Sequence, residues 1–308
     1  MPHVLILGED APRYLQLLQA ENLPQITFSI FPDAESASQA CGLAEIILGA
    51  PDAVAKLLPH CDRLEWVQSS WAGVKPLIVA ARRDYQLTGV KDLFGLRMSE
   101  FVMGWLLALE RNILRRSGRS QWDHSADSSL AGKTLGIMGT GSIGSAVAGT
   151  ALAFGLQIRG MNSSGEPTDP FQQCYATQHR MQFAQGLDYL VALLPDTSAT
   201  DGMVDQQLLA ALNPGAIFIN AGRANCVDDD ALIRALEDGQ LGAAVLDVVH
   251  TEPLPDDDPL WRIENLYVTS HTAAPTPENS VVSLFAENYR RYLDGLPLLH
   301  LINFDRGY

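Results

Sequence analysis

Three polar residues with catalytic potential each follow a short apolar run in the second half of the chain. Arg223 follows AIFINAG, Glu252 comes a short loop after AAVLDVV, and His271 follows LYVTS. Parallel strands end at one edge of a sheet, and ligands bind at that edge. Although 29 and 19 residues separate these side chains in sequence, we therefore expect them to share one place in the fold.

Such a trio suits one kind of chemistry. An arginine holds a carboxylate through two parallel charge-assisted hydrogen bonds. A histidine gives a proton to a carbonyl oxygen, and a neighbouring glutamate orients the histidine and stabilises its protonated form. Each residue alone is more simply a surface ion pair, a helix cap or a structural histidine. Together they favour reduction of a 2-keto acid beside a nicotinamide.

A glycine-rich segment, GTGSIG (139–144), has the spacing G-x-G-x-x-G. The pattern alone is weak, but here it follows the apolar run 134–138 and opens a helix of small residues, as in a dinucleotide-binding turn. Gly139 permits the turn, Gly141 lets the backbone approach a pyrophosphate, and Gly144 allows close packing of helix on strand. The cofactor contacts predicted in this loop are Gly139, Gly141, Ser142, Ile143 and Gly144.

Short apolar runs alternate with helical patterns along the whole chain. The runs lack a clean polar alternation, which is typical of strands covered on both faces, and the intervening helices imply parallel βαβ units. We expect an α/β fold with two doubly wound parallel-sheet domains, the first over 1–97 completed by 282–308 and the second over 98–281. A helix is expected over 97–117 and another over 276–295. The expected strands are 3–8, 44–49, 64–69, 85–90, 134–139, 156–161, 188–194, 216–222, 243–249 and 266–270.

Composition and charge exclude several classes of protein. The 308 residues are 47% hydrophobic and 19% charged, as in a globular protein, and the net charge of −15 argues against nucleic acid and anionic membranes as partners. No apolar run approaches the length of a membrane span, and no metal-binding pattern is present. The cysteines lack CxxC pairing, so we expect reduced thiols and a cytoplasmic protein; they are Cys41, Cys61, Cys174 and Cys226.

The motifs as an ordered set resemble the D-isomer specific 2-hydroxyacid dehydrogenases, nearest the glyoxylate/hydroxypyruvate reductase group. The resemblance is carried by GTGSIG, LLPDTSATDGMVD, NAGRANCVDDDALIRALEDGQLGAAVLDVVHTEPLPDDDPLW and VTSHTAAPT, with WVQSSWAGV in the first domain. It implies a flavodoxin-like substrate domain, a Rossmann nucleotide-binding domain and an active site in the cleft between them. It also implies a homodimer, formed through the polar segment before residue 134.

The resemblance assigns a role to each residue of the trio. Arg223 binds the substrate carboxylate, His271 acts as acid and base, and Glu252 supports that histidine. Trp71, Ala72 and Gly73 complete the substrate contacts, with Trp71 at the pocket wall. Further contacts to the cofactor are implied at Leu194, Pro195, Ala221, Gly222, Arg223, Asp247, His271 and Ala273, with Asp247 at the nicotinamide carboxamide.

The segment RGMNSSGE (159–166) bears on which dinucleotide is used. NAD-binding relatives place an acid at the end of the second strand, where it accepts hydrogen bonds from the ribose. This chain has Asn162, Ser163 and Ser164 there, and its first acid is Glu166. Hydrogen-bond donors suit a 2′-phosphate, so we predict a preference for NADPH with NADH still usable. The arginine that NADP-using relatives usually carry near Ser163 is missing.

Several alternatives remain open on the sequence. A dinucleotide-sensing regulator of the corepressor type could keep the same trio, and so could a related dehydrogenase with another substrate. His250 neighbours Glu252 but lacks the family's position, so we interpret it as a loop residue. Cys226 is interpreted as a small buried hydrophobe, and Asp256–Asp258 as a solvated turn. The basic residues Arg111, Arg115, Arg116 and Arg119 are interpreted as a solvated face or a subunit contact.

Overall fold

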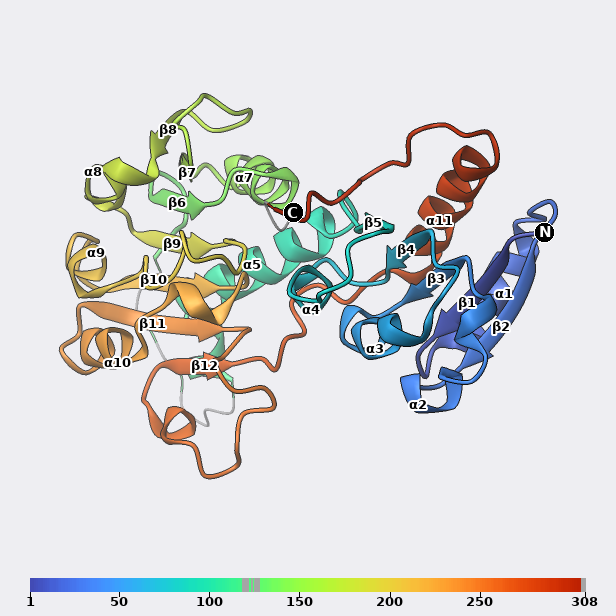
Figure 1. Ribbon diagram of the computed structural model, residues 1–308. Coiled ribbons are helices and arrows are strands. Elements are labelled where there is room, and N and C mark those ends of the chain that lie inside the picture. The colour runs from blue at the N-terminus through green and yellow to red at the C-terminus, as the bar shows by residue number, and fades with distance from the viewer. Residues whose placement is uncertain (118–121, 123, 125–127, 306–308) are drawn as a thin grey trace. The chain divides into compact units, whose positions relative to one another are not determined.

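A computed structural model describes residues 1–305 except 118–121, 123 and 125–127. The chain forms two compact units, one of residues 1–93 with 276–308 and one of residues 94–275. Each unit contains a single parallel β-sheet with helices on both faces (Figure 1). The expected α/β fold class with two parallel-sheet domains is confirmed. Arg119 of the basic cluster lies outside the described residues.

The first unit contains a sheet of five strands in the order β2-β1-β3-β4-β5. Alternate strand residues such as Leu5, Ile47 and Val67 pack with α2, α3 and α4 on one face. On the other face Trp66 stacks on Phe285 of α11, with ring centroids 5.0 Å apart. The elements are β1 His3–Leu7, α1 Ala11–Ala20, β2 Thr27–Phe31, α2 Ala34–Ala37, β3 Ile46–Gly49, α3 Pro51–Leu57, β4 Trp66–Ser69, α4 Lys75–Ile78, β5 Gln86–Thr88 and α11 Glu278–Leu293.

The second unit contains a sheet of seven strands in the order β12-β11-β10-β9-β6-β7-β8. The chain leaves β6 toward one edge and returns beside it at β9, so the strand order reverses between β6 and β9, where ligands of such sheets bind. Its elements are α5 Gly95–Glu110, α6 Ile113–Arg116, β6 Thr134–Met138, α7 Ser142–Ala153, β7 Gln157–Asn162, β8 Gln173–Ala176, α8 Arg180–Ala184, β9 Tyr189–Ala192, α9 Gln206–Ala210, β10 Ala216–Asn220, α10 Asp229–Glu237, β11 Leu241–Leu246 and β12 Leu266–Val268.

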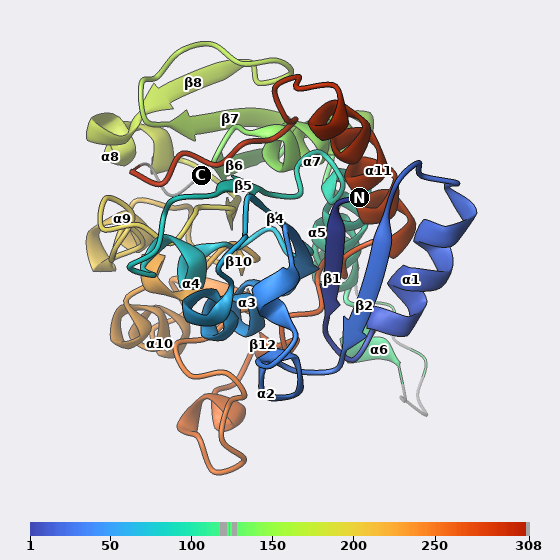
Figure 2. The same cartoon turned by 45° about the vertical axis from the view of Figure 1, so that its right-hand side comes forward.

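Both faces of this second sheet are covered (Figure 2). Ile217 and Ile219 of β10 pack in a core with α5 and α7. Phe218, between them, points to the other face and packs in a core with α8, α9 and α10. Because both faces are buried, the central strands β6, β9, β10 and β11 are apolar at most positions, which explains why they lack polar alternation.

The structure differs from the sequence-based expectations at two edge strands and one helix. β2 and β8 were not expected, and each lies at the edge of its sheet, where the strand is only partly buried. The helix expected over 97–117 is divided, because Asn112 adopts a left-handed conformation (φ 51°) that ends α5 and precedes α6. Partly exposed edge strands carry a weaker hydrophobic signal than central ones, which is why the sequence did not reveal them.

Candidate active site

The glycine-rich loop connects β6 to α7 at the reversal of strand order. Gly139 has φ +104°, and a Cβ built on it would lie 2.8 Å from the carbonyl oxygen of Leu193. A Cβ on Gly144 would lie 2.0 Å from the carbonyl oxygen of Gly139. A side chain at either position would therefore push the loop away from β9 or the helix away from the loop.

Gly141 differs from these two glycines. It has an ordinary φ of −70°, and a Cβ built on it would meet no protein atom within 4 Å. Neither backbone strain nor packing within the protein requires glycine here, so the open space is available to a ligand. No side chain caps the start of α7, and its first N–H groups can bind an anion. The loop thus fits the pyrophosphate of a dinucleotide.

Asn162, at the end of β7, organises the turn that follows. Its side-chain amide donates to Thr140 Oγ1 at 3.1 Å and to the carbonyl of Glu166 at 2.9 Å. Its Oδ1 accepts from the backbone N–H of Ser164 and of Gly165, at 3.2 and 2.6 Å. Both amide hydrogens are already used, so Asn162 shapes the loop and has no donor left over for a 2′-phosphate.

The two serines beside Asn162 are exposed but differ in their partners. The Ser164 hydroxyl lies 3.3 Å from Asn162 Oδ1 and accepts the N–H of Glu166 at 3.2 Å. Ser163 has no side-chain hydrogen bond within the described part of the chain. Ser163 is therefore the side chain of this segment whose hydroxyl is available to a ligand.

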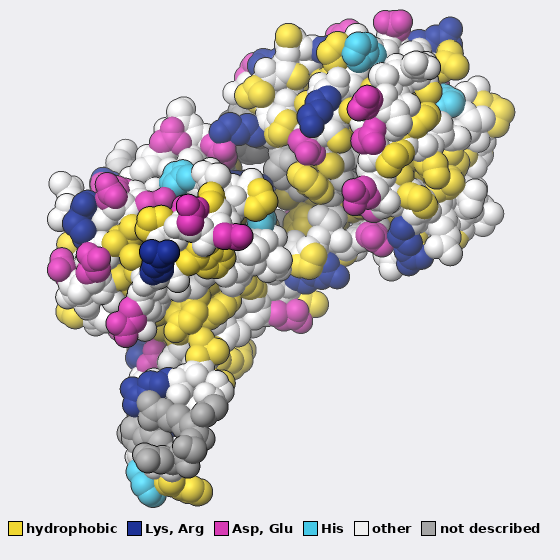
Figure 3. All heavy atoms as spheres, turned by 90° about the horizontal axis from the view of Figure 1, so that it is seen from below, with side chains coloured by type: hydrophobic (Ala, Val, Ile, Leu, Met, Phe, Trp, Pro, Cys, Tyr) yellow, Lys and Arg dark blue, Asp and Glu magenta, His cyan; other side chains and the backbone are white. Residues whose placement is uncertain are grey.

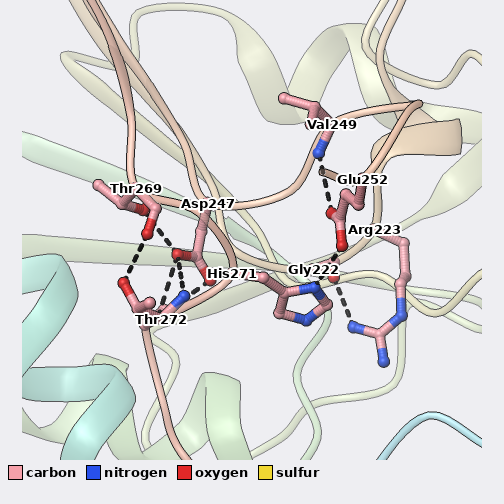
Figure 4. A network of polar contacts seen from close by, with 9 residues as sticks. Gly222, Arg223, Asp247, Val249, Glu252, Thr269, His271 and Thr272 are labelled. Atoms are coloured by element: carbon pink, nitrogen blue, oxygen red, sulfur yellow. Dashed lines mark hydrogen bonds and ion pairs between the residues drawn. The ribbon is translucent and has the colours of Figure 1, made fainter. Parts of the chain in front are cut away.

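His271 and Glu252 form a hydrogen-bonded pair (Figure 4). Nδ1 of His271 lies 2.8 Å from Oε2 of Glu252, and the backbone N–H of Val249 donates to Oε1 at 3.1 Å. The two side chains are 51% and 39% exposed, so they can meet a substrate. Because Glu252 occupies Nδ1, Nε2 is the ring nitrogen available for proton transfer.

Arg223 lies beside this pair. Its Nη1 donates to the carbonyl of Gly222 at 2.7 Å, and Figure 4 shows its guanidinium next to the imidazole of His271. The carbonyl of Arg223 accepts from Asn220 Nδ2 at 3.0 Å and from the thiol of Cys226 at 3.1 Å. Burial raises the pKa of Cys226 to about 12, so this thiol is a structural donor and a poor nucleophile.

Asp247 follows β11 and is 3% exposed. Its carboxylate accepts hydrogen bonds from the backbone N–H of Thr272, at 2.8 Å, and of Ala273, at 3.1 Å from each oxygen. It therefore holds the loop after β12, which contains His271. Among the described residues, Oδ2 accepts the N–H of Ala273 alone, so it retains a lone pair with which to accept from a cofactor amide.

Comparisons with known proteins identify the family of this chain. Residues 103–273 match the model of the D-isomer specific 2-hydroxyacid dehydrogenase NAD-binding domain. The chain belongs to this family. The resemblance seen in the sequence is confirmed, and the family is one of oxidoreductases that act on 2-hydroxy acids and 2-keto acids.

Relatives and solved structures of this dehydrogenase family support the assignment. A glyoxylate/hydroxypyruvate reductase A from Serratia proteamaculans is 41% identical over 155 residues, half the length of each protein. A family member from Aeromonas salmonicida has a similar crystal structure, with TM-score 0.93, 38% identity and 99% of each chain covered. An NADPH-dependent glyoxylate/hydroxypyruvate reductase from Sinorhizobium meliloti, solved with NADP and sulfate, has TM-score 0.89 and 26% identity over 100% of each chain.

The remaining residues that the dehydrogenase family implies as cofactor contacts also follow strands of the second sheet. They come after β9, β10 and β12, and therefore at the carboxyl edge that carries His271. They are Leu194, Pro195, Ala221, Gly222 and Ala273. Trp71, Ala72 and Gly73 follow β4 in the first unit, where the carbonyl and N–H of Trp71 bind the Ser69 hydroxyl at 2.7 and 3.1 Å. Their part in substrate binding stays a prediction.

Three residues of the dehydrogenase site had no signal in the sequence: Thr140, Val249 and Thr269. Thr140 binds Asn162, Val249 donates to Glu252, and Thr269 donates to Asp247 at 2.6 Å. Two of these contacts join residues more than twenty positions apart, and no periodicity predicts them. His250 faces α10, where Nε2 lies 3.7 Å from Asp229 and 3.3 Å from the carbonyl of Val227.

The described residues offer no metal site and no membrane-spanning helix. No group of three or more His, Cys, Asp or Glu side chains in them is arranged to hold a metal ion. None of the helices described is long and apolar enough to cross a membrane. On the face shown in Figure 3, acidic side chains are scattered over the surface of both units.

Proposed function

We propose that the protein reduces a small 2-keto acid of the glyoxylate or hydroxypyruvate type to the D-2-hydroxy acid. The observation that carries this proposal is the 2.8 Å pair of His271 and Glu252 beside Arg223. This pair lies at the same sheet edge as the open glycine loop. When bound, the nicotinamide cofactor supplies the hydride. The names of the Serratia and Sinorhizobium relatives support the same substrate class.

Each side chain has a separate task in this reaction. Arg223 holds the substrate carboxylate with its planar fork of donors. His271, protonated, gives its Nε2 proton to the carbonyl oxygen as that oxygen gains negative charge. Glu252 keeps Nδ1 protonated and the ring oriented, as carboxylates do for catalytic histidines. The proposal also includes the substrate contacts that the family resemblance implies at Trp71, Ala72 and Gly73.

The preferred cofactor in this proposal is NADPH, with NADH still usable. No acid stands between Asn162 and Gly165 to repel a 2′-phosphate, and the exposed hydroxyl of Ser163 can donate to one. The Sinorhizobium reductase is named NADPH-dependent and was solved with NADP. Asp247 meets the nicotinamide carboxamide through Oδ2.

The proposal also includes a homodimer in the cytoplasm. Ile113 and Leu114 of α6 are 53% and 41% exposed, and they lie next to the segment that the family uses as its dimerisation arm. A groove of about 650 Å³ near them is lined by Leu107, Arg111, Ile113, Arg116 and Ser117. All four cysteines are free, which suits a reducing compartment. Sedimentation equilibrium of the wild type and of Ile113→Asp tests the dimer.

The proposed activity is tested by steady-state assays with a panel of 2-keto acids and both reduced cofactors. Simple aldehydes serve as controls, because they lack the carboxylate that Arg223 binds. We expect turnover of glyoxylate or hydroxypyruvate, faster with NADPH. Tight binding of the dinucleotide with no turnover of any keto acid would contradict the proposal and favour a dinucleotide-sensing regulator.

A further inference from the structure

Two consecutive residues of the site adopt a left-handed backbone. Ser270 and His271 both have φ 57°, and neither is glycine. Side chains other than glycine disfavour this conformation, since the Cβ approaches the following carbonyl oxygen. Residues held in such conformations persist only where the surroundings fix them, and they cluster at functional sites. The backbone that presents His271 therefore needs a restraint.

The restraint is the buried carboxylate of Asp247. The hydroxyl of Thr269, just before the left-handed pair, donates to Oδ1 at 2.6 Å. The N–H groups of Thr272 and Ala273, just after the pair, donate to the same oxygen at 2.8 and 3.1 Å. The N–H of His271 donates to the backbone carbonyl of Asp247 at 2.7 Å. The carboxylate thus binds the chain on both sides of Ser270 and His271.

A further hydrogen bond closes this loop on itself. The hydroxyl of Thr272 donates to the carbonyl of Thr269 at 2.6 Å, so the residues flanking the left-handed pair are joined directly. In Figure 4 these contacts lie on one side of His271, while Glu252 and Arg223 lie on the other. The contacts to Asp247 therefore set the direction in which the His271 side chain points from the backbone. This direction places the imidazole within hydrogen-bonding distance of Glu252.

We propose that Thr269 and Asp247 act together as positioning residues for His271. This inference rests on the proposed function, because it concerns the group that transfers the proton. Thr269 supplies the side-chain donor to Oδ1 and can be changed alone, whereas the other donors to the carboxylate are backbone groups. Without the Thr269 hydroxyl, the loop loses the restraint that precedes Ser270. The hydrogen bond between His271 and Glu252, which holds the ring in its reactive orientation, is then formed for a smaller fraction of the time.

This role is separable from a contact of Asp247 with the cofactor. The Thr269 hydroxyl binds Oδ1, whereas Oδ2 is the oxygen with room for a further donor. Removing the hydroxyl should therefore alter the histidine while leaving the cofactor's contact to Oδ2 in place. A loss confined to kcat, without loss of cofactor affinity, distinguishes the two roles.

The experiment compares Thr269→Val, which keeps the shape and loses the hydroxyl, with Thr269→Ser, which keeps the hydroxyl. Hydrogen bonds to charged groups contribute enough that we expect Thr269→Val to lower kcat about tenfold or more. The Kd for NADPH, from fluorescence titration without substrate, should change less than about twofold, because the Thr269 hydroxyl binds Oδ1 and its loss leaves Oδ2 free to accept from the cofactor. Thr269→Ser should recover most of kcat. Thr150→Val is the matched control, since that hydroxyl binds the carbonyl of Ala146 within α7.

One further measurement separates this role from a general loss of stability. NMR of the His271 ring, which needs no turnover, should show in Thr269→Val a weaker hydrogen bond from Nδ1 to Glu252 than in the wild type. It therefore tests the inference even if the wild type reduces no keto acid. Unchanged kcat and an unchanged Nδ1 hydrogen bond in Thr269→Val would overturn the inference, as would a loss of NADPH affinity in proportion to kcat.

Discussion

The first turn of each parallel sheet connects a strand to a helix through a glycine, yet the two turns present different surfaces. In the first unit, β1 leads through Gly8 (φ +142°) to α1. In the second, β6 leads through Gly139 (φ +104°) to α7. Both helices begin at the carboxyl edge of their sheet, where a helix N-terminus attracts anions.

The side chains around each helix N-terminus determine whether it is accessible to an anion. Glu9 and Asp10 precede α1, and Pro12 removes a backbone donor from its first turn. A Cβ on Gly8 would lie 2.5 Å from Oδ1 of Asp10, so the acid covers this turn. At α7 the corresponding places hold Thr140, Gly141 and Ser142, and no acid is present. The same strand-turn-helix unit therefore carries acids that repel an anion in one sheet and is open to an anion in the other, so the fold alone does not predict the function.

The largest effect should come from removing His271, the proposed proton donor at the carboxyl edge of the second sheet. We expect His271→Ala to lower kcat for keto-acid reduction by about 10²–10⁴-fold, because it abolishes general acid catalysis. Steady-state kinetics at saturating NADPH measure this loss. His250→Ala is the control, since that ring contacts Asp229 and not Glu252. A kcat within about threefold of wild type in His271→Ala would return His271 to a structural role.

Giving the second turn an acid, as in the first turn, should make it repel an anion as well. We expect Gly141→Asp to weaken NADPH binding about 100-fold or more, because a carboxylate would lie beside the pyrophosphate in a partly desolvated place. The fold should survive, since a Cβ at this position meets no protein atom within 4 Å. Fluorescence titration gives the affinity, and Gly141→Ala separates lost space from added charge. Full NADPH affinity in Gly141→Asp would mean that the pyrophosphate binds elsewhere.

A smaller effect is expected at the end of β7, where we propose that NADPH is distinguished from NADH. Ser163→Asp should lower kcat/KM for NADPH about tenfold or more through repulsion of the 2′-phosphate, and should change that for NADH far less. Ser163 is a better position for this change than Asn162, because the Asn162 amide holds Thr140 and Glu166. The ratio of kcat/KM values is the measurement. A wild type that clearly prefers NADH would contradict the proposed preference.

The smallest effect should come from neutralising the acid of the first turn. Burial raises the pKa of Asp10, and Glu278 and Glu9 add to this. A raised folded-state pKa means that this group favours folding most at pH below its ordinary value of 3.8, and loses that contribution as the pH rises through the folded-state pKa. Asp10→Asn should thus raise the stability at pH 7 by about 0.5 kcal/mol or less.

Urea unfolding at two pH values tests this effect of Asp10. The gain should vanish as the pH falls well below 3.8, where the wild-type carboxyl is protonated in both states. The side chain of Asp10 makes no capping hydrogen bond to α1, so no cap is lost in the variant. Activity should not change. An equal gain at both pH values would show that the charge of Asp10 is not its cause.

The fold was largely predictable from the sequence because its central strands are buried on both faces. Runs such as those of β6 and β10 are continuous apolar segments, and the glycine spacing marks the turn between β6 and α7. The edge strands β2 and β8 were missed because their side chains are partly exposed. Periodicity reports burial, and it weakens where burial is incomplete.

The site was predictable in part, for a different reason. Arg223, Glu252 and His271 could be placed at one edge because strand topology alone brings them together. The residues that hold the trio in place could not be predicted. Thr269 and Asp247 meet because the loop contains two left-handed residues, and no local sequence pattern predicts that conformation. Asn162 lies at the end of the strand, as predicted. Its side-chain amide, however, donates to Thr140 and not toward the place predicted for the cofactor.

The stacking of Trp66 on Phe285 has a consequence for synthesis. The strand that carries Trp66 leaves the ribosome well before α11, because the whole of residues 94–275 is translated between them. At ordinary elongation rates this interval is roughly 10–35 s. By the end of that time the second unit has all of its sequence, whereas one apolar face of the first sheet still awaits its last helix. The nascent chain is therefore most exposed to chaperones, and to aggregation, at the face that α11 finally covers.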